Sequence, residues 1–213
     1  MRCVVFTKPP IPGTCKTRLI PALGPEGAAA LHRAMAEDVL ACAQNAGLSV
    51  ELAVTGCADH PWFTQLSLPL SVQVEGDLGA RMLAALTPGP AIALGTDSPT
   101  LPVEVLRSAT QLQTDILLGP ASDGGYWCIG WKTPQPALMR EMPWSTDRVF
   151  PETVLRARQM GLGIQQLPTW YDVDTPAALA HLREHLRTLP PSVAPRTREF
   201  LNAAADRRPP RAP

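Results

Sequence analysis

The chain has 213 residues, which is enough for one domain with a sizeable hydrophobic core. Its 19 basic and 19 acidic residues cancel, so no net charge favours binding to nucleic acid or to an anionic membrane. We therefore expect small-molecule partners. The apolar start of the chain breaks at Lys8, too early for a signal peptide or a membrane span, which predicts a cytoplasmic protein. The same features leave open whether the chain forms a homodimer.

Short apolar runs alternate with longer segments of helical periodicity. In chain order, the sequence predicts a strand at 3–7, a helix at 25–45, strands at 50–55 and 71–74, a helix at 78–86, a strand at 91–94, a helix at 103–113, strands at 116–118 and 126–129, a helix at 147–160, a strand at 164–167 and a helix at 176–189. This alternation is typical of β-α-β units. It predicts an α/β fold with a mostly parallel sheet and helices on both faces.

The composition changes at Pro190, where six prolines and five arginines fall among the last 24 residues. Such a segment buries too little apolar surface to offset the entropy lost on ordering. We therefore expect a domain over residues 1–189 and a tail over 190–213. Within the tail, residues 198–206 have the composition of a short docking helix.

A cationic loop directly follows the first predicted strand. Lys8, Lys16 and Arg18 lie within eleven residues, and Gly13 allows the backbone to approach a ligand closely. Such a loop can bind a diphosphate or triphosphate through charge-assisted hydrogen bonds. It has neither the Walker spacing nor the Gly-x-Gly-x-x-Gly spacing of dinucleotide-binding folds. The alternative is a proline-stiffened surface turn with solvated lysines.

Asp97 ends the buried run 91–94 in a polar turn, where open α/β sheets present carboxylates to ligands. A carboxylate there can hold a divalent cation against the phosphates of a nucleotide. It can instead cap the helix that begins near Pro102. Asp172 and Asp174 share one face if their segment is extended, and Asp174 or the next residue can also cap the following helix.

Three further motifs each allow a local explanation. Asp77 is a candidate N-cap, although Arg81 would then project from the first helical turn toward an anion. The run Asp123-Gly-Gly-Tyr is a candidate hairpin turn, or a loop on the same rim as Asp97. In Pro143-Trp-Ser-Thr, a helix cap by Ser145 or Thr146 is the favoured role.

The four histidines are expected to lie away from these motifs. His181 and His185 are four residues apart on a predicted helix without a third ligand, which is typical of a solvated helix face rather than a metal site. The five cysteines form no Cys-x-x-Cys pair, which argues against a zinc site or a disulfide framework.

Taken together, these motifs resemble the bacterial DUF2064 family over residues 1–189. The matching runs are Lys8-x-Pro-x-Pro-Gly-x-x-Lys-Thr-Arg-Leu, Gly76-Asp-Leu-Gly-x-Arg-Met, Gly95-Thr-Asp-Ser-Pro, Asp123-Gly-Gly-Tyr, Pro143-Trp-Ser-Thr and Asp172-Val-Asp-Thr-Pro. The Lys16-Thr-Arg-Leu loop is also similar to 2-phospho-L-lactate guanylyltransferase. The chain lacks the Gly-x-Gly-Thr-Arg start of many sugar nucleotidyltransferases, so the resemblance does not specify the nucleobase.

The resemblance implies a GT-A fold of the nucleotide-diphospho-sugar transferase superfamily, a three-layer α/β/α sandwich. It implies a transferase in which Asp97 and Asp174 bind Mg²⁺ or Mn²⁺, with Asp172 as the weaker candidate. The first expected reaction is nucleotidyl transfer from a nucleoside triphosphate to a phosphorylated small molecule. Glycosyl transfer from a nucleotide-sugar is the alternative, and a nucleotide-binding regulator without turnover is the third possibility.

The motifs then divide into three expected sets of site residues. The nucleotide-binding set is Lys8, Gly13, Thr14, Lys16, Thr17, Arg18, Asp77, Gly79, Arg81 and Thr96. The acceptor-binding set is Asp123, Gly124, Gly125, Tyr126, Trp144 and Ser145. The catalytic set is Lys16, Arg18, Asp97 and Asp123.

Overall fold

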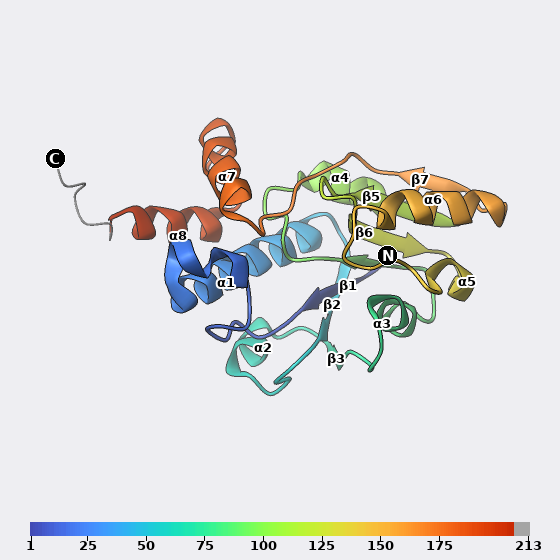
Figure 1. The fold of residues 1–213 in the computed structure, drawn as a ribbon, viewed down its shortest axis with the longest axis horizontal. Coiled ribbons are helices and arrows are strands. Elements are labelled where there is room, and N and C mark those ends of the chain that lie inside the picture. The colour runs from blue at the N-terminus through green and yellow to red at the C-terminus, as the bar shows by residue number, and fades with distance from the viewer. Residues whose placement is uncertain (207–213) are drawn as a thin grey trace.

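A seven-stranded sheet forms the centre of the computed structural model, which describes residues 1–206 (Figure 1). The strands are β1 (Arg2–Thr7), β2 (Ser49–Val54), β3 (Leu70–Val72), β4 (Ala91–Leu94), β5 (Ile116–Pro120), β6 (Tyr126–Trp131) and β7 (Ile164–Gln166). Their order in the sheet is β3-β2-β1-β4-β6-β5-β7. Within this sheet β6 alone runs antiparallel to its neighbours. The expected mostly parallel sheet is confirmed.

Helices cover both faces of the sheet. They are the 3₁₀ turn η1 (Thr17–Leu19), α1 (Ile20–Asn45), α2 (Pro61–Leu66), α3 (Leu78–Ala85), α4 (Val103–Ala109), α5 (Pro136–Met139), α6 (Val149–Gln159), α7 (Pro176–Thr188) and α8 (Pro195–Asp206). The buried side chains of α1, α2 and α4 share one core cluster, and those of α3, α5 and α6 share the other. The result is a three-layer α/β/α sandwich.

The alternation of side chains along the strands explains why two cores form. Cys3 and Val5 of β1 lie in the cluster with α1, whereas Val4 lies in the cluster with α3. In β4, Ile92 and Ala93 divide in the same way. Successive side chains of a strand point to opposite faces, so a strand that is covered on both sides must be apolar throughout.

The structure differs from the predicted elements mainly at short helices. The helices α2 and α5 were not expected, because six and four residues are too few to show a helical period. α1 begins at Ile20 rather than 25, because a kink at Gly24, with φ of 70°, joins an extra turn to the main helix. α4 ends at Ala109, four residues before its predicted end.

The segment after residue 189 is more buried than expected. α8 begins at Pro195, and its Leu201 packs with Leu31 and Met35 of α1 and with α7 in a third apolar cluster. Burial over residues 190–204 is therefore higher than the composition predicts, since four-residue spacing supplies an apolar face that the overall composition conceals. The tail residues 207–213 lie outside the described residues. None of the helices described over residues 1–206 is long and apolar enough to cross a membrane.

Candidate functional site

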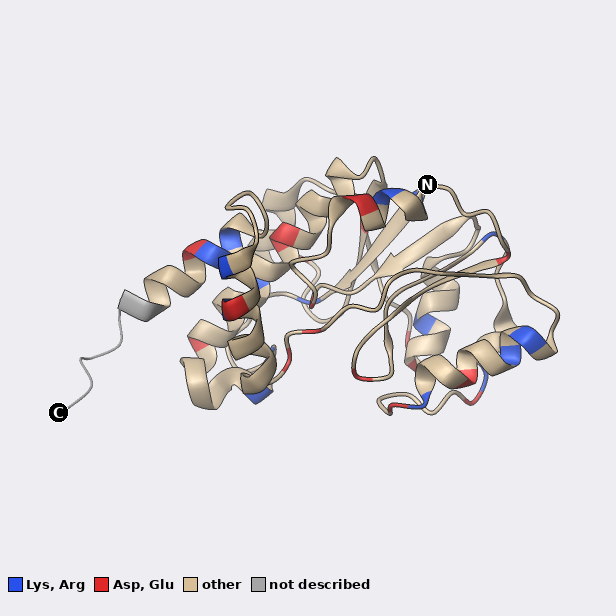
Figure 2. Ribbon diagram, turned by 90° about the horizontal axis from the view of Figure 1, so that it is seen from above, with Lys and Arg blue, Asp and Glu red and all other residues tan. Residues whose placement is uncertain are grey.

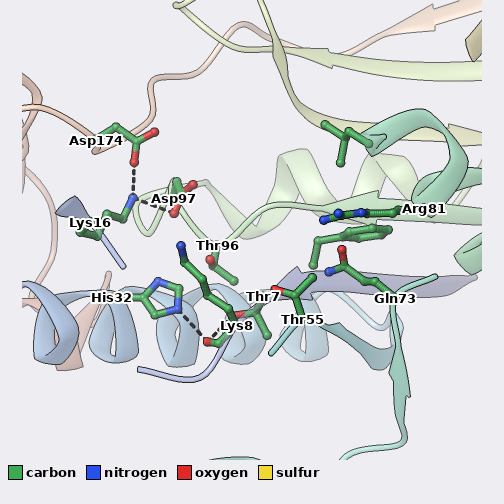
Figure 3. A pocket seen from close by; sticks show the side chains of 12 residues that line it. Thr7, Lys8, Lys16, His32, Thr55, Gln73, Arg81, Thr96, Asp97 and Asp174 are labelled. Atoms are coloured by element: carbon green, nitrogen blue, oxygen red, sulfur yellow. Dashed lines mark hydrogen bonds and ion pairs between the residues drawn. The ribbon is translucent and has the colours of Figure 1, made fainter. Parts of the chain in front are cut away.

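A cavity of about 360 Å³ opens at the edge of the sheet where β1, β2 and β4 end. The loops after these strands and the helices α1 and α3 supply most of its walls (Figure 3). Its lining residues are Phe6, Thr7, Lys8, Lys16, His32, Thr55, Gln73, Leu78, Arg81, Thr96, Asp97 and Asp174. Six of these were expected as site residues in the nucleotide-binding or metal-binding sets: Lys8, Lys16, Arg81, Thr96, Asp97 and Asp174.

Lys16 is held between two carboxylates that come from distant parts of the chain. Its ammonium lies 2.7 Å from Oδ1 of Asp97 and 2.6 Å from Oδ1 of Asp174. It also donates to the carbonyl oxygen of Val173 at 2.8 Å. An ammonium has three N–H donors, so these three acceptors use all of them. The Lys16 side chain is only 4% exposed, and its backbone is left-handed, with φ of 46°.

The charges at this junction stabilise one another. Burial alone would lower the pKa of Lys16, but Asp97 and Asp174 beside it raise that pKa above its usual value. Loss of hydration would raise the pKa of Asp97, yet the Lys16 ammonium holds it below its usual range. Asp97 is therefore an ionised carboxylate. It does not cap α4, whose N-cap is Pro102 without a side-chain bond.

Asp172 occupies a different position from Asp174. Oγ of Ser98 donates to its Oδ1 at 2.9 Å, and also to the carbonyl oxygen of Tyr171. Burial, together with the nearby negative charges of Asp97, Asp123 and Asp174, raises the pKa of Asp172 to about 7. It supports the loop that carries Asp174, whereas Thr175 is the N-cap of α7.

The rest of the cationic loop is divided between two hollows. Lys8 lines the main cavity and donates to the carbonyl oxygen of Thr14 at 2.6 Å, which closes the loop that Gly13, with φ of 83°, allows to turn. Thr17 and Arg18 instead line a second, polar hollow of about 250 Å³. The two hollows share Lys16 and Asp174, which lie between them.

His32 lines the cavity, which corrects the expectation that all four histidines lie away from the motifs. It is 4% exposed on the inner face of α1, and its Nε2 lies 3.0 Å from the carbonyl oxygen of Lys8. Because a carbonyl oxygen only accepts, Nε2 carries the proton and Nδ1 is left as an acceptor. Burial lowers the pKa of His32, which favours the neutral ring. One feature of the sequence indicates this position: His32 lies beside Leu31 and Met35 in the apolar stripe of the helix.

Of the two histidines of α7, His181 is exposed, as expected for a helix face in contact with solvent, and His185 is half-buried beside Tyr171. Nδ1 of His185 lies 2.9 Å from the hydroxyl of Tyr171, and the His181 ring packs edge-on against the Tyr171 ring at 4.6 Å. These contacts attach α7 to the segment that carries the metal-binding candidates.

At the opposite end of the cavity, Asp77 and Gly79 have local roles. Oδ1 of Asp77 accepts from the backbone N–H of Ala80 at 2.8 Å. Asp77 is therefore the N-cap of α3, which is one of the two roles expected for it. A Cβ at Gly79 would lie 2.9 Å from the Trp144 ring, so close packing explains this glycine. Arg81 does reach the cavity. The neutral side chains Thr55 and Gln73, which sequence reasoning missed, complete this end because they follow strands whose pairing the motifs do not reveal.

The residues of the expected acceptor-binding set lie outside the cavity lining. Oδ1 of Asp123 accepts from the backbone N–H of Gly125, and a Cβ at Gly124 would meet the backbone of Asp147. The Tyr126 and Trp144 rings pack edge to face, and neither their hydroxyl nor their indole nitrogen has a hydrogen-bond partner in residues 1–206.

The expected cap at Ser145 or Thr146 is wrong. α6 begins at Val149, and its N-cap Arg148 makes no side-chain bond. The Thr146 hydroxyl donates to the Pro143 carbonyl oxygen and accepts from the backbone N–H of Arg148 at 3.3 Å, so it orders the turn before α6 and does not cap the helix itself.

Only two carboxylates, Asp97 and Asp174, converge at the cation position. Within residues 1–206, no three His, Cys, Asp or Glu side chains are grouped so that they could hold a metal ion by themselves. Mg²⁺ in nucleotide sites is commonly held by one or two carboxylates together with substrate phosphates and water. The residues present therefore fit a metal that arrives with its substrate, rather than a resident ion in an all-protein cage. Figure 2 shows acidic and basic residues interspersed along the helices and loops of the molecule.

Comparisons with known proteins identify the family and the fold of the chain. The model of the family described as "Uncharacterized protein conserved in bacteria (DUF2064)" matches residues 38–146. A crystal structure from Desulfovibrio desulfuricans, described as a nucleotide-diphospho-sugar transferase, has 29% identity and a TM-score of 0.85. The match covers 97% of this chain and 98% of that chain. No curated protein matches the sequence.

More distant structures share the fold. A nucleotidyl transferase from Methanothermobacter has 14% identity and a TM-score of 0.58, over 88% of this chain and 99% of that one. The inositol-1-phosphate CTP transferase of T. maritima has 14% identity and a TM-score of 0.55, over 94% and 96%. The expected fold of the nucleotide-diphospho-sugar transferase superfamily is confirmed.

Proposed function

The chain belongs to the DUF2064 family and is a transferase of the nucleotide-using superfamily, and we propose that it transfers a nucleotidyl group from a nucleoside triphosphate to a phosphorylated small molecule. The observation that carries the proposal is the junction of Lys16, Asp97 and Asp174 at one end of the cavity. It offers both signs of charge that a metal-bound polyphosphate requires.

The division of the cationic loop between two hollows favours a triphosphate over a diphosphate as the substrate. Lys8 lies in the main cavity, whereas Arg18 lies in the polar hollow beyond Lys16 and Asp174. A phosphate chain that passes Lys16 would meet cations on both sides of it. A diphosphate would need only one of these two hollows.

Lys16 and the metal compete for the same carboxylates. All three donors of Lys16 are used within the protein, so Lys16 reaches a phosphate only by leaving Asp97 and Asp174. In our proposal Asp97 and Asp174 would hold Mg²⁺ or Mn²⁺ when the nucleotide binds, and the Lys16 ammonium would leave them and turn to the phosphates. The bound ion would supply neutralisation of phosphate charge.

The other residues act by orientation. His32 holds the Lys8 carbonyl and thereby fixes the loop that binds the phosphates. The acceptor phosphate oxygen forms a bond to the α-phosphorus while the bond to the bridging oxygen breaks, so pyrophosphate leaves. No covalent nucleophile is needed, because alignment and charge stabilisation supply most of the acceleration. Asp123, Gly124, Gly125, Tyr126, Trp144 and Ser145 remain the proposed acceptor side.

Glycosyl transfer is the second candidate, because the structure with 29% identity is described as a nucleotide-diphospho-sugar transferase. The two reactions release different products. Purified protein with Mg²⁺ or Mn²⁺, the four nucleoside triphosphates and a panel of phosphorylated acceptors should release pyrophosphate. Release of a nucleoside diphosphate from a nucleotide-sugar, without pyrophosphate release from any triphosphate, would contradict the proposal. Dependence on a nucleoside triphosphate is also the ground for proposing a cytoplasmic location.

A further inference from the structure

We infer that Gln73 and Arg81 read the nucleobase, and that they select a base whose edge presents one hydrogen-bond donor followed by two acceptors. The inference rests on the proposed function, because it assigns the part of the cavity that the phosphate and metal contacts leave free. Gln73 and Arg81 both line the cavity, at the end away from Lys16, Asp97 and Asp174 (Figure 3). Guanine and cytosine are the two common bases with such an edge.

Gln73 offers the base an acceptor. Its backbone N–H donates to the Val54 carbonyl oxygen at 2.9 Å, and its side-chain Nε2 donates to the Ala53 carbonyl oxygen at 2.8 Å. Because the Ala53 oxygen can only accept, the amide must turn its nitrogen toward β2, and its Oε1 is left for a ligand. Nε2 keeps a second N–H, so Gln73 by itself does not exclude adenine, and the choice between bases rests on the two donors of Arg81.

Arg81 offers the base two donors. Its Nε donates to the Gly76 carbonyl oxygen at 3.0 Å, which fixes the plane of the guanidinium group. Its two terminal nitrogens have no hydrogen-bond or ion-pair partner among residues 1–206. A guanidinium fork is best satisfied by two adjacent acceptors, as when arginine binds O6 and N7 of guanine.

Together the two side chains specify an order of groups along the base. Guanine presents N1–H, O6 and N7 in sequence, and cytosine presents N4–H, N3 and O2. Adenine and uracil offer only one acceptor in line after the donor. In adenine the third position is a C–H group, and in uracil the second acceptor lies on the other side of the donor. One arginine nitrogen would therefore stay unpaired with either base. The apolar side chains of Phe6 and Leu78 in the same wall give the base ring a surface to pack against.

Titration calorimetry of the full chain with Mg²⁺ and each of the four nucleoside triphosphates tests the inference. We expect GTP, CTP or both to bind at least about ten-fold more tightly than ATP and UTP, the range that one paired base contact supplies. Two guanine nucleotide analogues distinguish guanine from cytosine as the base that binds. If guanine is the ligand, ITP should match GTP, and 7-deaza-GTP, which lacks the N7 acceptor, should bind more weakly. If cytosine is the ligand, CTP alone should bind tightly.

Two variants assign the effect to these residues. Arg81→Lys, which replaces the fork with one point charge, and Gln73→Leu should each reduce the preference over ATP and UTP by about ten-fold. Binding of pyrophosphate, a probe for the other end of the cavity, should stay within about two-fold. Arg158→Lys on the exposed face of α6 is the matched control, and thermal melting checks that each variant is folded.

The outcomes separate this inference from the proposed function. Equal affinity for all four triphosphates, or an equal loss for all four in Arg81→Lys and Gln73→Leu, overturns base reading and leaves the proposed function intact. Binding of nucleotide-sugars alone overturns nucleotidyl transfer, and the same base order measured with GDP-sugars against UDP-sugars then decides base reading separately. Failure to bind any nucleotide overturns both.

Discussion

Asp38 and Asp97 both join distant parts of the chain, but they do so with different partners. Asp38 of α1 is 4% exposed and accepts from the backbone N–H groups of Arg196 and Thr197, at 3.2 and 2.8 Å. Asp97 pairs with the side-chain ammonium of Lys16, and its own side chain is 38% exposed in the cavity. Backbone donors cannot leave without unfolding α8, whereas an ammonium can exchange with another cation. The first contact fits a structural role and the second a functional one.

Asp97→Asn is expected to have the largest effect, because it removes the charge of the contact with a functional role. The neutral amide is a poor ligand for Mg²⁺, so affinity for nucleotide with Mg²⁺ should fall by at least about 100-fold, since even residues that only support a metal ligand cost roughly 10- to 100-fold. Titration calorimetry measures the loss, and circular dichroism should show an unchanged fold. Wild-type affinity in this variant would remove Asp97 from the proposed metal site.

Lys16→Met separates the two roles of the lysine. Removing one partner of a buried ion pair costs about 3–5 kcal/mol, and the cost here should be lower because both carboxylates are partly exposed. Without divalent ions the variant should melt at a lower temperature than the wild type. Mg²⁺ alone should restore much of that loss, because it can take the place of the ammonium. Wild-type protein should respond little to Mg²⁺ unless nucleotide is present.

The control for this test is Lys132→Met, since the Lys132 ammonium donates to the Gln113 carbonyl oxygen on the surface. Its melting temperature should be independent of Mg²⁺. If wild-type protein is stabilised by Mg²⁺ alone as strongly as Lys16→Met, the exchange of Lys16 with the metal is wrong.

Asp38→Ala tests the structural side of the comparison. It removes the acceptor for the first two N–H groups of α8, and loss of such a cap costs about 1–2 kcal/mol. Chemical denaturation should show this loss, while nucleotide affinity stays within about two-fold. Asp38→Asn, which keeps one acceptor oxygen, should lose less. A large loss of nucleotide affinity would show that α8 and the cavity are coupled.

The smallest expected effect on stability belongs to Arg18→Ala. Arg18 is exposed beside the second hollow, so the free energy of unfolding should change by less than about 0.5 kcal/mol. Nucleotide affinity should fall by about five-fold if a phosphate reaches that hollow. An unchanged affinity for triphosphates would restrict the phosphate chain to the main cavity.

The sequence predicts those parts of the site that follow directly from a strand. The apolar run before Asp97 predicts that Asp97 lies at the sheet edge. The end of the first strand beside Lys8 predicts the same for Lys8. The pairing of Lys16 with Asp174 was not predictable, since these residues are 158 positions apart and each has a local explanation. His32 was missed because a buried histidine on an apolar helix face has the same periodicity as core residues.

The stability of Lys16 variants shows the same limit. In the sequence Lys16 is one of three loop cations with a surface character, so a substitution is expected to cost little stability. In the structure its side chain is 4% exposed between two carboxylates. The difference comes from tertiary pairing, which local composition does not encode.

The origin of the cavity residues also affects how the protein is made. Of the residues that line the cavity, all except Asp174 come from residues 6–97, the half of the chain that is synthesised first. Until Asp174 has been added by the ribosome, Lys16 lacks one of its two carboxylates and the cation position is half built. In the proposed function, a nucleotide with its metal would therefore stabilise only a chain that already contains Asp174.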